Sequence, residues 1–288
     1  FRRLEQLAPE VELVQFVDGD CEVVLGWVQV AADALRERSD VGAVCGYRRE
    51  RHVDASIYNR LCDMDWRGSG SKVGYFGGDV MMRAEAFRQV QGYNPAMIAG
   101  EDPEICVRLR QAGWKILRLD TQMTLHDAAM TRFAQWWRRM VRGGHAYAEG
   151  MVLHGRSPER YCVKKVISIL AWAAFLPLVI LALAWPTRGL SLLLLGLYAV
   201  LWLRVRRARL DRNDPVKEAS LYAAFCVIGK FAELLGVALY LINLIRGRRT
   251  RIIEYKVVEP VDQGGAASDG VDGNGDGLSR LKSASNTD

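Results

Sequence analysis

The chain has 288 residues, half of them hydrophobic, and a formal net charge of +6 at pH 7. This length allows one substantial domain and a smaller second part. Its six cysteines include no C-x-x-C pair, which argues against a zinc site and a disulfide framework and favours a reducing compartment. The arginines gather beside apolar segments and no nucleic-acid-binding motif is present. We therefore expect membrane lipids, and no nucleic acid, as partners of the positive charge.

The first half of the chain predicts alternating strands and helices. An apolar run over 11–17 predicts a buried strand that stops at the tripeptide DGD (18–20). Apolar residues recur at helical spacing over 22–38, and residues 41–45 predict a second strand. Strand, helix and strand in this order indicate an α/β fold.

The pattern continues to the end of the soluble part. The further expected elements are a basic loop at 48–52, a helix over 56–66, a strand over 73–83 broken by two glycines, a helix over 84–90, a helix from 101 to 113, strands at 114–119 and 123–126, and a helix over 131–149. The last helix is amphipathic and rich in Trp and Arg, so we expect one of its faces to pack against something apolar.

Two apolar segments predict a membrane hairpin. Residues 166–185 carry no charge over about the 20 residues that a spanning helix needs, and 189–203 form a shorter second candidate. Basic stretches precede the first segment and follow the second at 204–212. The positive-inside rule places both stretches in the cytosol. We expect a multi-pass protein of the cell (inner) membrane with a cytosolic soluble domain.

A third apolar segment, 219–245, carries Lys230 and Glu233 near its middle. It predicts either an interfacial or re-entrant helix with an ion pair at i,i+3, or a third span with buried charges. The Gly-, Asp- and Ser-rich residues 258–288 predict a disordered tail. Within that tail, 269–276 is similar to a calcium loop but lacks its spacing and its closing glutamate.

Asp18 and Asp20 follow the first predicted strand, where open α/β sheets bind ligands. With one residue between them, both carboxylates can reach a single hard cation. Mg²⁺ or Mn²⁺ held by few carboxylates completes its shell with phosphate oxygens, so a metal-bridged diphosphate is the natural ligand. The alternative is that Asp-Gly-Asp is a simple turn.

Glu101 and Asp102 open a predicted helix, followed by Pro103. Asp102 either caps the helix N-terminus or serves as a general base that removes a proton from an attacking hydroxyl. A helix N-terminus lowers a carboxylate pKa, which would weaken such a base.

His126 follows a short strand and is either a metal ligand or a structural histidine. The segment Gln135-Trp136-Trp137-Arg138-Arg139 combines flat aromatic rings with guanidinium groups. These side chains either bind sugar, base and phosphate or anchor an interfacial helix at the membrane.

The order of these motifs resembles a family-2 glycosyltransferase, an inverting enzyme with the GT-A fold and C-terminal membrane helices. The resemblance covers about residues 11–147. It includes the DGD tripeptide, a Gly77-Gly78-Asp79 segment, Gly100-Glu101-Asp102 and QWWRR (135–139). It divides the chain into a catalytic domain (1–150), a membrane region (151–257) and the tail (258–288).

The resemblance implies roles for individual residues. Asp18 and Asp20 would hold Mg²⁺ or Mn²⁺ and the diphosphate of a nucleotide-sugar donor, with a UDP-sugar as the expected type, and His126 would be a further metal ligand. Asp102 would be the catalytic base beside Glu101. The residues expected to bind donor or acceptor are Gly77, Gly78, Asp79, Gln135, Trp136, Arg138 and Arg139.

The resemblance and the membrane hairpin together imply a polyprenyl-linked or cell-surface polysaccharide acceptor. Arg139 stands where processive members of the family have a Trp, which argues against processive synthesis. Because the chain begins with Phe1 and the family's nucleotide-binding strand should precede it, we expect a fragment that lacks this strand.

Two other functions fit parts of the sequence. A non-catalytic membrane scaffold could retain the same fold. A strand that ends in Asp-x-Asp is also typical of haloacid-dehalogenase-type phosphatases, in which Asp18 would be the nucleophile and Lys115 a candidate for the required lysine.

Overall fold

The computed structural model describes residues 10–67, 74–248, 250 and 252–256, which belong to one unit, Phe1–Lys256. The expected disordered tail and its calcium-loop-like segment lie outside the described residues.

Five strands form one mixed sheet in the order β1-β4-β3-β5-β2. The strands are β1 (Leu13–Phe16), β2 (Cys21–Val23), β3 (Val41–Glu50), β4 (Val80–Arg83) and β5 (Lys115–His126). Only β3 and β5 run parallel, and the other three pairs are antiparallel. The expected α/β class is thus confirmed, with a sheet of mixed strand direction.

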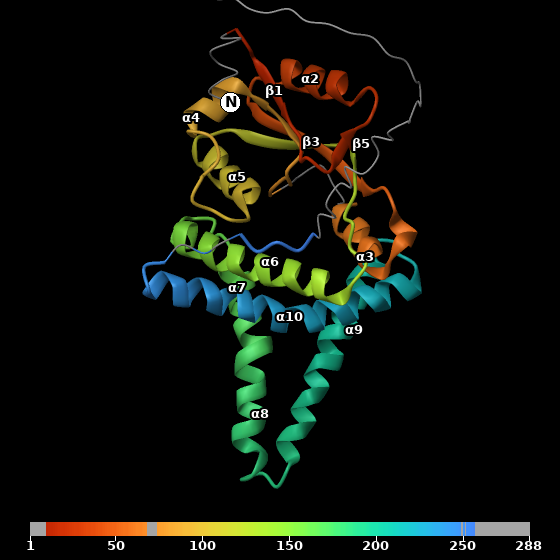
Figure 1. The fold of residues 1–288 in the computed structure, drawn as a ribbon, viewed down its shortest axis with the longest axis vertical. Coiled ribbons are helices and arrows are strands. Elements are labelled where there is room, and N and C mark those ends of the chain that lie inside the picture. The colour runs from red at the N-terminus through yellow and green to blue at the C-terminus, as the bar shows by residue number, and fades with distance from the viewer. Residues whose placement is uncertain (1–9, 68–73, 249, 251, 257–288) are drawn as a thin grey trace, which may run out of the picture. The chain divides into compact units, whose positions relative to one another are not determined.

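Helices cover both faces of the sheet and continue into the apolar region. They are α2 (Trp27–Glu37), η1 (Val53–Ala55), α3 (Ile57–Trp66), α4 (Ala84–Gln89), α5 (Glu101–Gln111), α6 (Phe133–His154), α7 (Val163–Leu170), η2 (Ala171–Phe175), α8 (Leu176–Ala184), η3 (Leu190–Leu195), α9 (Gly196–Leu210) and α10 (Val216–Ile245). Helix α2 lies on one face of the sheet, and α5 lies on the other, between the sheet and α6 (Figure 1). The core between these layers includes Trp27, Leu35, Met82, Ile105 and Leu109, all nearly inaccessible to solvent.

Long-range strand pairing changed three of the expected elements. Glu22 and Val23, expected at the start of a helix, instead belong to β2 (Cys21–Val23), because this segment pairs with the end of β5. The expected basic loop at 48–52 begins as strand, because β3 continues to Glu50 beside β5. The two expected strands at 114–119 and 123–126 are one strand, whose polar middle stays in the sheet through irregular pairing with β3.

The expected strand over 73–83 is shortened to β4, and the glycines that precede it are irregular. The physical reason is a close approach: a Cβ atom on Gly78 would lie 2.0 Å from a carboxylate oxygen of Asp18. The backbone at this point therefore makes room for Asp18 and does not continue the sheet.

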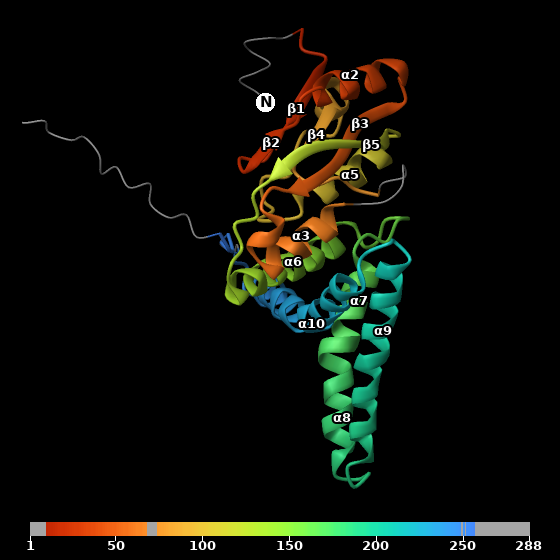
Figure 2. The same cartoon turned by 90° about the vertical axis from the view of Figure 1, so that its right-hand side faces the viewer.

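Helices α7, η2 and α8 form one continuous apolar helix, Val163–Ala184, which is long and apolar enough to cross a membrane. Its middle turn, η2, has π-helical hydrogen bonding just before Pro177, a residue that cannot donate a backbone hydrogen bond. The chain returns through η3 and α9, side by side with α8 (Figures 1 and 2). This pair of segments is the predicted hairpin.

Helix α10 also has the length and hydropathy of a spanning helix. It packs along α6 and runs across the direction of the hairpin (Figures 1 and 2). Glycines allow the two backbones to touch, since a Cβ on Gly144 would lie 2.0 Å from the carbonyl oxygen of Glu233. The apolar partner expected for the amphipathic α6 is therefore α10. Lys230 pairs with Glu233 at 2.8 Å, the i,i+3 ion pair expected for an interfacial or re-entrant helix.

Candidate active site

A pocket of about 610 Å³ brings together most of the acidic and basic residues that the sequence singled out. Its lining residues are Asp18, Gly19, Asp20, Arg48, Trp66, Ala99, Gly100, Glu101, Asp102, His126, Arg139, Arg142, Gly143, Ala146, Tyr147 and Tyr255. They come from the loop after β1, the ends of β3 and β5, the N-terminus of α5, helix α6 and the segment that follows α10. The pocket thus lies where the sheet meets α6.

Asp18 is held from two sides. Its backbone N–H donates a hydrogen bond of 2.9 Å to Asp79 Oδ1, and its carboxylate accepts one of 3.1 Å from Arg48 Nη2. The same Arg48 nitrogen lies 2.8 Å from Asp79 Oδ2, which also accepts a hydrogen bond from Thr124. Asp79 is fully buried and does not line the pocket. It supports Asp18 from behind.

The register between β3 and β5 explains why these partners meet. Arg48 lies opposite Thr124, and Glu50 lies opposite His126. Neighbouring β2 places Cys21 opposite His126. Three strand ends therefore gather the polar side chains that surround the DGD tripeptide.

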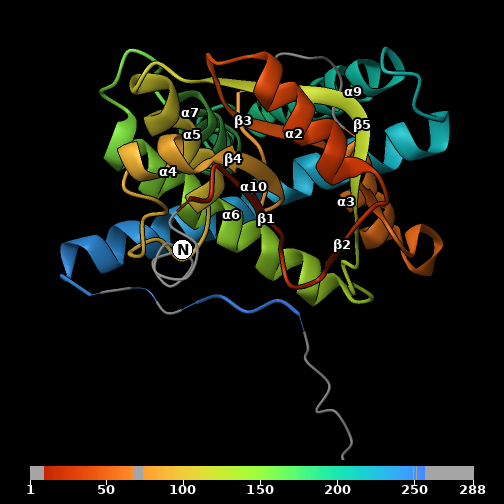
Figure 3. The same cartoon turned by 90° about the horizontal axis from the view of Figure 1, so that it is seen from above.

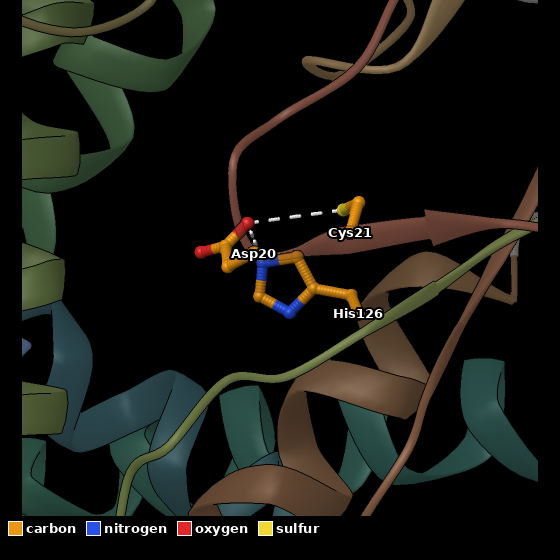
Figure 4. Close-up of side chains that lie close together, drawn as sticks. All are labelled: Asp20, Cys21 and His126. Carbon is orange, nitrogen blue, oxygen red and sulfur yellow. Dashed lines mark hydrogen bonds and ion pairs between the residues drawn. The ribbon is translucent and has the colours of Figure 1, made fainter.

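Asp20 faces His126 across the pocket floor (Figure 4), with 3.3 Å between Asp20 Oδ1 and His126 Nε2. Lys256 forms an ion pair with the other oxygen of Asp20. Burial alone would raise the pKa of Asp20, but the hydrogen bonds from His126 and Lys256 outweigh it and hold the pKa well below its usual range. Asp20 is therefore ionised at neutral pH.

Within the described residues, two groups of side chains are close enough to hold a metal ion. Asp20, Cys21 and His126 form one, and Asp18, Cys21 and Asp79 form the other, with all ligand atoms of a group within 4.8 Å. Burial raises the pKa of the Cys21 thiol far above neutrality, so the thiol is protonated and unsuited to a hard cation. The carboxylates and His126 are the suitable ligands.

Asp102 opens into the same pocket from the N-terminal turn of α5. The N-cap of α5 is Gly100, in the left-handed region at φ 82°, and no side chain caps the helix. The alternative that Asp102 is the N-cap is therefore wrong. The N-cap residue has a left-handed backbone conformation, which glycine adopts much more easily than other residues. A Cβ on Gly100 would also lie 3.0 Å from Ala146 Cβ, so the turn sits directly on α6.

The environment of Asp102 raises its pKa to about 8. Burial is the largest cause, and the negative charges of Glu101 and Asp18 add to it. The expected lowering by the helix N-terminus is outweighed. A carboxylate with a pKa near neutrality is suited to take a proton from a hydroxyl.

Two arginines and His126 surround the Trp66 ring in the same pocket. The guanidinium groups of Arg48 and Arg139 lie 5.6 and 5.7 Å from the Trp66 ring centroid, and the His126 ring lies 4.3 Å from it. Arg139 also donates to Cys62 Sγ at 3.0 Å. This part of the pocket offers positive charge and a flat surface to a phosphorylated ligand.

The segment after α10 runs back along α6 to this pocket (Figures 1 and 3). Thr250 Oγ1 lies 2.8 Å from His145 Nε2, and Tyr255 lies under the guanidinium of Arg142 at 5.8 Å. Lys256 then reaches Asp20 and the carbonyl oxygen of Asp127. We call residues 252–256 the return segment.

Of the seven residues expected to bind donor or acceptor, only Arg139 is part of this pocket lining, and Asp79 lies buried behind Asp18. Gln135 bonds the backbone of residues 129, 131 and 132 and so closes the N-terminal turn of α6. Trp136 is buried against Phe225, with 4.8 Å between ring centroids. Arg138 is exposed. Gly77 and Gly78 are also absent from the lining, and Gly78 contacts Asp18 from behind.

Lys115, which the phosphatase hypothesis required, forms an ion pair of 2.6 Å with Asp40 and does not line the pocket.

Sequence reasoning missed several residues of the site, among them Arg48, Trp66, Tyr255 and Lys256. Arg48 was assigned to a basic loop, although its place in β3 opposite Thr124 makes it a partner of Asp18. Trp66 ends a helix and carried no motif. The two residues of the return segment follow the apolar region, where nothing in the sequence pointed to a role beside Asp20.

A family model described as the N-terminal domain of galactosyltransferase matches residues 60–132. No curated protein matches the chain. Among solved structures, the mannosyltransferase PcManGT from Pyrobaculum calidifontis, in complex with GDP-Man and Mn²⁺, aligns with a TM-score of 0.49 and 18% identity. The alignment covers 83% of this chain and 66% of that one.

The matched residues include the acidic pair of α5 and the histidine at the end of β5, which the pocket places beside Asp18 and Asp20. Over residues 60–132 the chain is thus similar to a galactosyltransferase domain, which supports the prediction of a glycosyltransferase.

Proposed function

We propose that this chain is a membrane-anchored, inverting glycosyltransferase of the family-2, GT-A type. It would move a sugar from a nucleotide sugar to a hydroxyl of a lipid-linked or cell-surface polysaccharide acceptor. One observation carries the proposal: Asp102, whose pKa is raised to about 8, lines the same pocket as the ionised Asp20 and His126. A proton acceptor and a diphosphate-binding site are the two parts that a single displacement at an anomeric carbon needs.

The residues present fit a divalent cation of the Mg²⁺ or Mn²⁺ kind. Asp20 is an ionised carboxylate. Among the described residues, His126 Nδ1 is buried without a hydrogen-bond partner, so the imidazole is free to adopt the tautomer that a metal requires. A Lys256 ammonium already sits on Asp20, which shows that the site accepts positive charge. Asp20, His126 and Asp18 would hold the ion, which when bound supplies charge stabilisation to a departing diphosphate.

The chain's own residues account for the other parts of the reaction. Asp102 takes the proton from the acceptor hydroxyl as the oxygen attacks the anomeric carbon. The bond from that carbon to the diphosphate oxygen breaks on the opposite side, and the electron pair leaves with the nucleoside diphosphate. Arg48 and Arg139 place positive charge on the wall nearest the departing group, and Trp66 offers a stacking surface. Attack from one side inverts the anomeric configuration.

The arrangement of the apolar helices supports a membrane anchor of the hairpin type. Helix Val163–Ala184 and the returning η3 and α9 would span, with the soluble domain on the cytosolic side. Helix α10 lies against α6 across the hairpin direction, which favours the interfacial prediction over a third span. The active-site pocket would then face the cytosol close to the membrane surface.

A donor panel tests the proposal. The full chain in membranes is incubated with radiolabelled UDP- and GDP-sugars, with and without Mn²⁺, and label transfer to the lipid and polysaccharide fractions is measured. We expect metal-dependent transfer from one donor, lost in Asp102→Asn. Transfer that survives Asp102→Asn contradicts the base assignment. The absence of any transfer, with donor binding intact, favours the non-catalytic scaffold.

A further inference from the structure

A second pocket of about 590 Å³ lies at the base of the apolar hairpin. Its lining includes Tyr75, Tyr161, Lys164, Lys165 and Ile167. Most of the pocket surface is apolar, with basic side chains at one end of α7. A pocket that combines basic groups and an apolar surface suits a ligand that carries both a phosphate and a hydrocarbon chain.

This second pocket adjoins the active-site pocket. The Tyr147 side chain lines both of them. At the start of α5, Asp102 lines the active-site pocket and the next residue, Pro103, lines the second. A ligand in the second pocket therefore lies close to the helix turn that carries the proposed catalytic base.

Three cations of this pocket have no carboxylate partner within the described part of the chain. Arg160, Lys164 and Lys165 form no ion pair there, whereas Arg110 in the same wall is paired with Glu159 at 2.6 Å. The Lys165 ammonium lies 4.2 Å from the centroid of the Tyr147 ring. Three positive charges around one pocket are the arrangement that binds phosphate.

An apolar path leads away from the pocket. Helix α7 begins at Val163 in its wall, and the continuous apolar helix exposes Ile167, Leu170, Leu178 and Leu181, with exposed fractions of 57%, 40%, 64% and 71%. A hydrocarbon chain that starts in the pocket can lie along these side chains and continue into the lipid.

We propose that this pocket binds the phosphate or diphosphate of an isoprenoid-linked saccharide acceptor. Lys164, Lys165 and Arg160 bind the phosphate, the lipid chain follows α7, and the saccharide passes Tyr147 to Asp102. This assignment rests on the proposed function only for the last step. There the saccharide O–H gives its proton to Asp102, its oxygen bonds to the donor's anomeric carbon, and the nucleoside diphosphate leaves with the electron pair of the broken bond.

Binding tests the site without requiring catalysis. The full chain is placed in phosphatidylcholine nanodiscs, with Mn²⁺ and nucleoside diphosphate added to fill the active-site pocket. Farnesyl diphosphate, farnesol, inorganic diphosphate and phosphatidylglycerol are then titrated. We expect farnesyl diphosphate to bind at least tenfold more tightly than the other three. Farnesol lacks the phosphate, inorganic diphosphate lacks the hydrocarbon chain, and phosphatidylglycerol offers a single phosphodiester charge between two bulky groups.

Charge variants locate that binding. K164Q/K165Q should weaken farnesyl diphosphate binding at least tenfold, and K164R/K165R should restore it. R204Q/R207Q is the matched control, because it removes two charges at the base of α9 outside the pocket, and it should have no effect. Equal binding of farnesol or phosphatidylglycerol, or equal losses in the control, overturns the proposal.

Activity separates this proposal from the proposed function. K164Q/K165Q should raise KM for a saccharide joined through diphosphate to an isoprenoid chain. It should leave KM unchanged for the same saccharide on a neutral alkyl chain. Equal effects on both acceptors overturn the phosphate assignment, while lysine-dependent binding without any sugar transfer supports the lipid site and contradicts the glycosyltransferase mechanism.

Discussion

The backbone N–H of Asp18 donates a 2.9 Å hydrogen bond to the buried carboxylate of Asp79, a residue 61 positions later in the chain. Arg48 joins the same pair by contacting both carboxylates. The first aspartate of the DGD tripeptide is therefore neither a free turn residue nor an unsupported ligand. It is held in position by a buried network, as residues that bind charged substrates need to be.

Gly78 and Gly77 offer a matched pair that tests this network. A Cβ at Gly78 would lie 2.0 Å from the Asp18 carboxylate, whereas the nearest atom to a Cβ at Gly77 is Arg48 Nη2 at 3.8 Å. We expect Gly78→Ala to displace Asp18 and lower kcat/KM at least tenfold, with a smaller loss for Gly77→Ala. Steady-state assays of purified variants measure this, and equal losses would show that the close contact is not what matters.

Asp102→Asn should lower kcat by roughly 10²–10⁴-fold, the range in which general bases contribute, with donor affinity unchanged. Because burial raises the pKa of Asp102 to about 8, the base is mostly protonated at pH 7. The kcat/KM of the unsubstituted enzyme should therefore rise with pH and level off above about pH 8. A flat profile between pH 6 and 9 contradicts the base assignment.

The same pKa predicts how stability depends on pH. The Asp102 pKa is raised in the folded state, so its favourable contribution is complete below the unfolded pKa near 4 and is lost as pH rises through about 8. Asp102→Asn removes this loss. We expect the metal-free variant to unfold at a higher temperature than the unsubstituted protein at pH 8.5 but not at pH 4.5, as measured by thermal unfolding. Equal shifts at both pH values would rule out titration of Asp102 as the cause.

Lys256 forms an ion pair with Asp20, one of the carboxylates proposed to bind the metal ion. Lys256→Ala should tighten Mn²⁺ binding by about two- to fivefold, which corresponds to the ~0.4–1 kcal/mol of a partly exposed ion pair. Mn²⁺ titration followed by electron paramagnetic resonance measures the change. Lys217→Ala, a lysine at the start of α10 away from the pocket, is the control. Weaker binding in Lys256→Ala would mean that the return segment positions Asp20 as a ligand.

Gly144 and Gly143 test the contact between α6 and α10. A Cβ at Gly144 would lie 2.0 Å from the Glu233 carbonyl oxygen, whereas a Cβ at Gly143 would face open space between the described residues. Gly144→Ala should lower the free energy of unfolding by about 1–3 kcal/mol, the cost of overpacking. Gly143→Ala should raise it by up to ~1 kcal/mol, since alanine favours helix. Thermal unfolding in detergent measures both, and equal effects would contradict the close packing.

The sequence predicted those elements whose signal lies within one segment. The uncharged run from 166 to 185, the helical spacing of α3 and the acidic pair at the start of α5 each depend on neighbouring residues, and the structure contains an element at each of these places. The DGD tripeptide and His126 were also placed near one another correctly, because the ends of neighbouring strands meet at one edge of a sheet.

Elements that depend on strand pairing were predicted less well. A single β5 and the short β2 follow from hydrogen bonds between segments about 100 residues apart, which local propensity does not record. Gln135 was predicted to bind ligand because of its motif. In the structure its side chain instead hydrogen-bonds the backbone of the preceding turn and closes the N-terminus of α6.

By itself, the sequence determined which side chains could carry the chemistry, and that an apolar hairpin follows the soluble domain, because residue type and periodicity are local properties. Only the tertiary structure decided what those side chains do. It buried Asp79 beneath Asp18, raised the pKa of Asp102 through burial and neighbouring charge, and brought Lys256 back to Asp20. Each of these depends on distances between segments far apart in the chain, and electrostatic free energy is set by such distances and by exclusion of water.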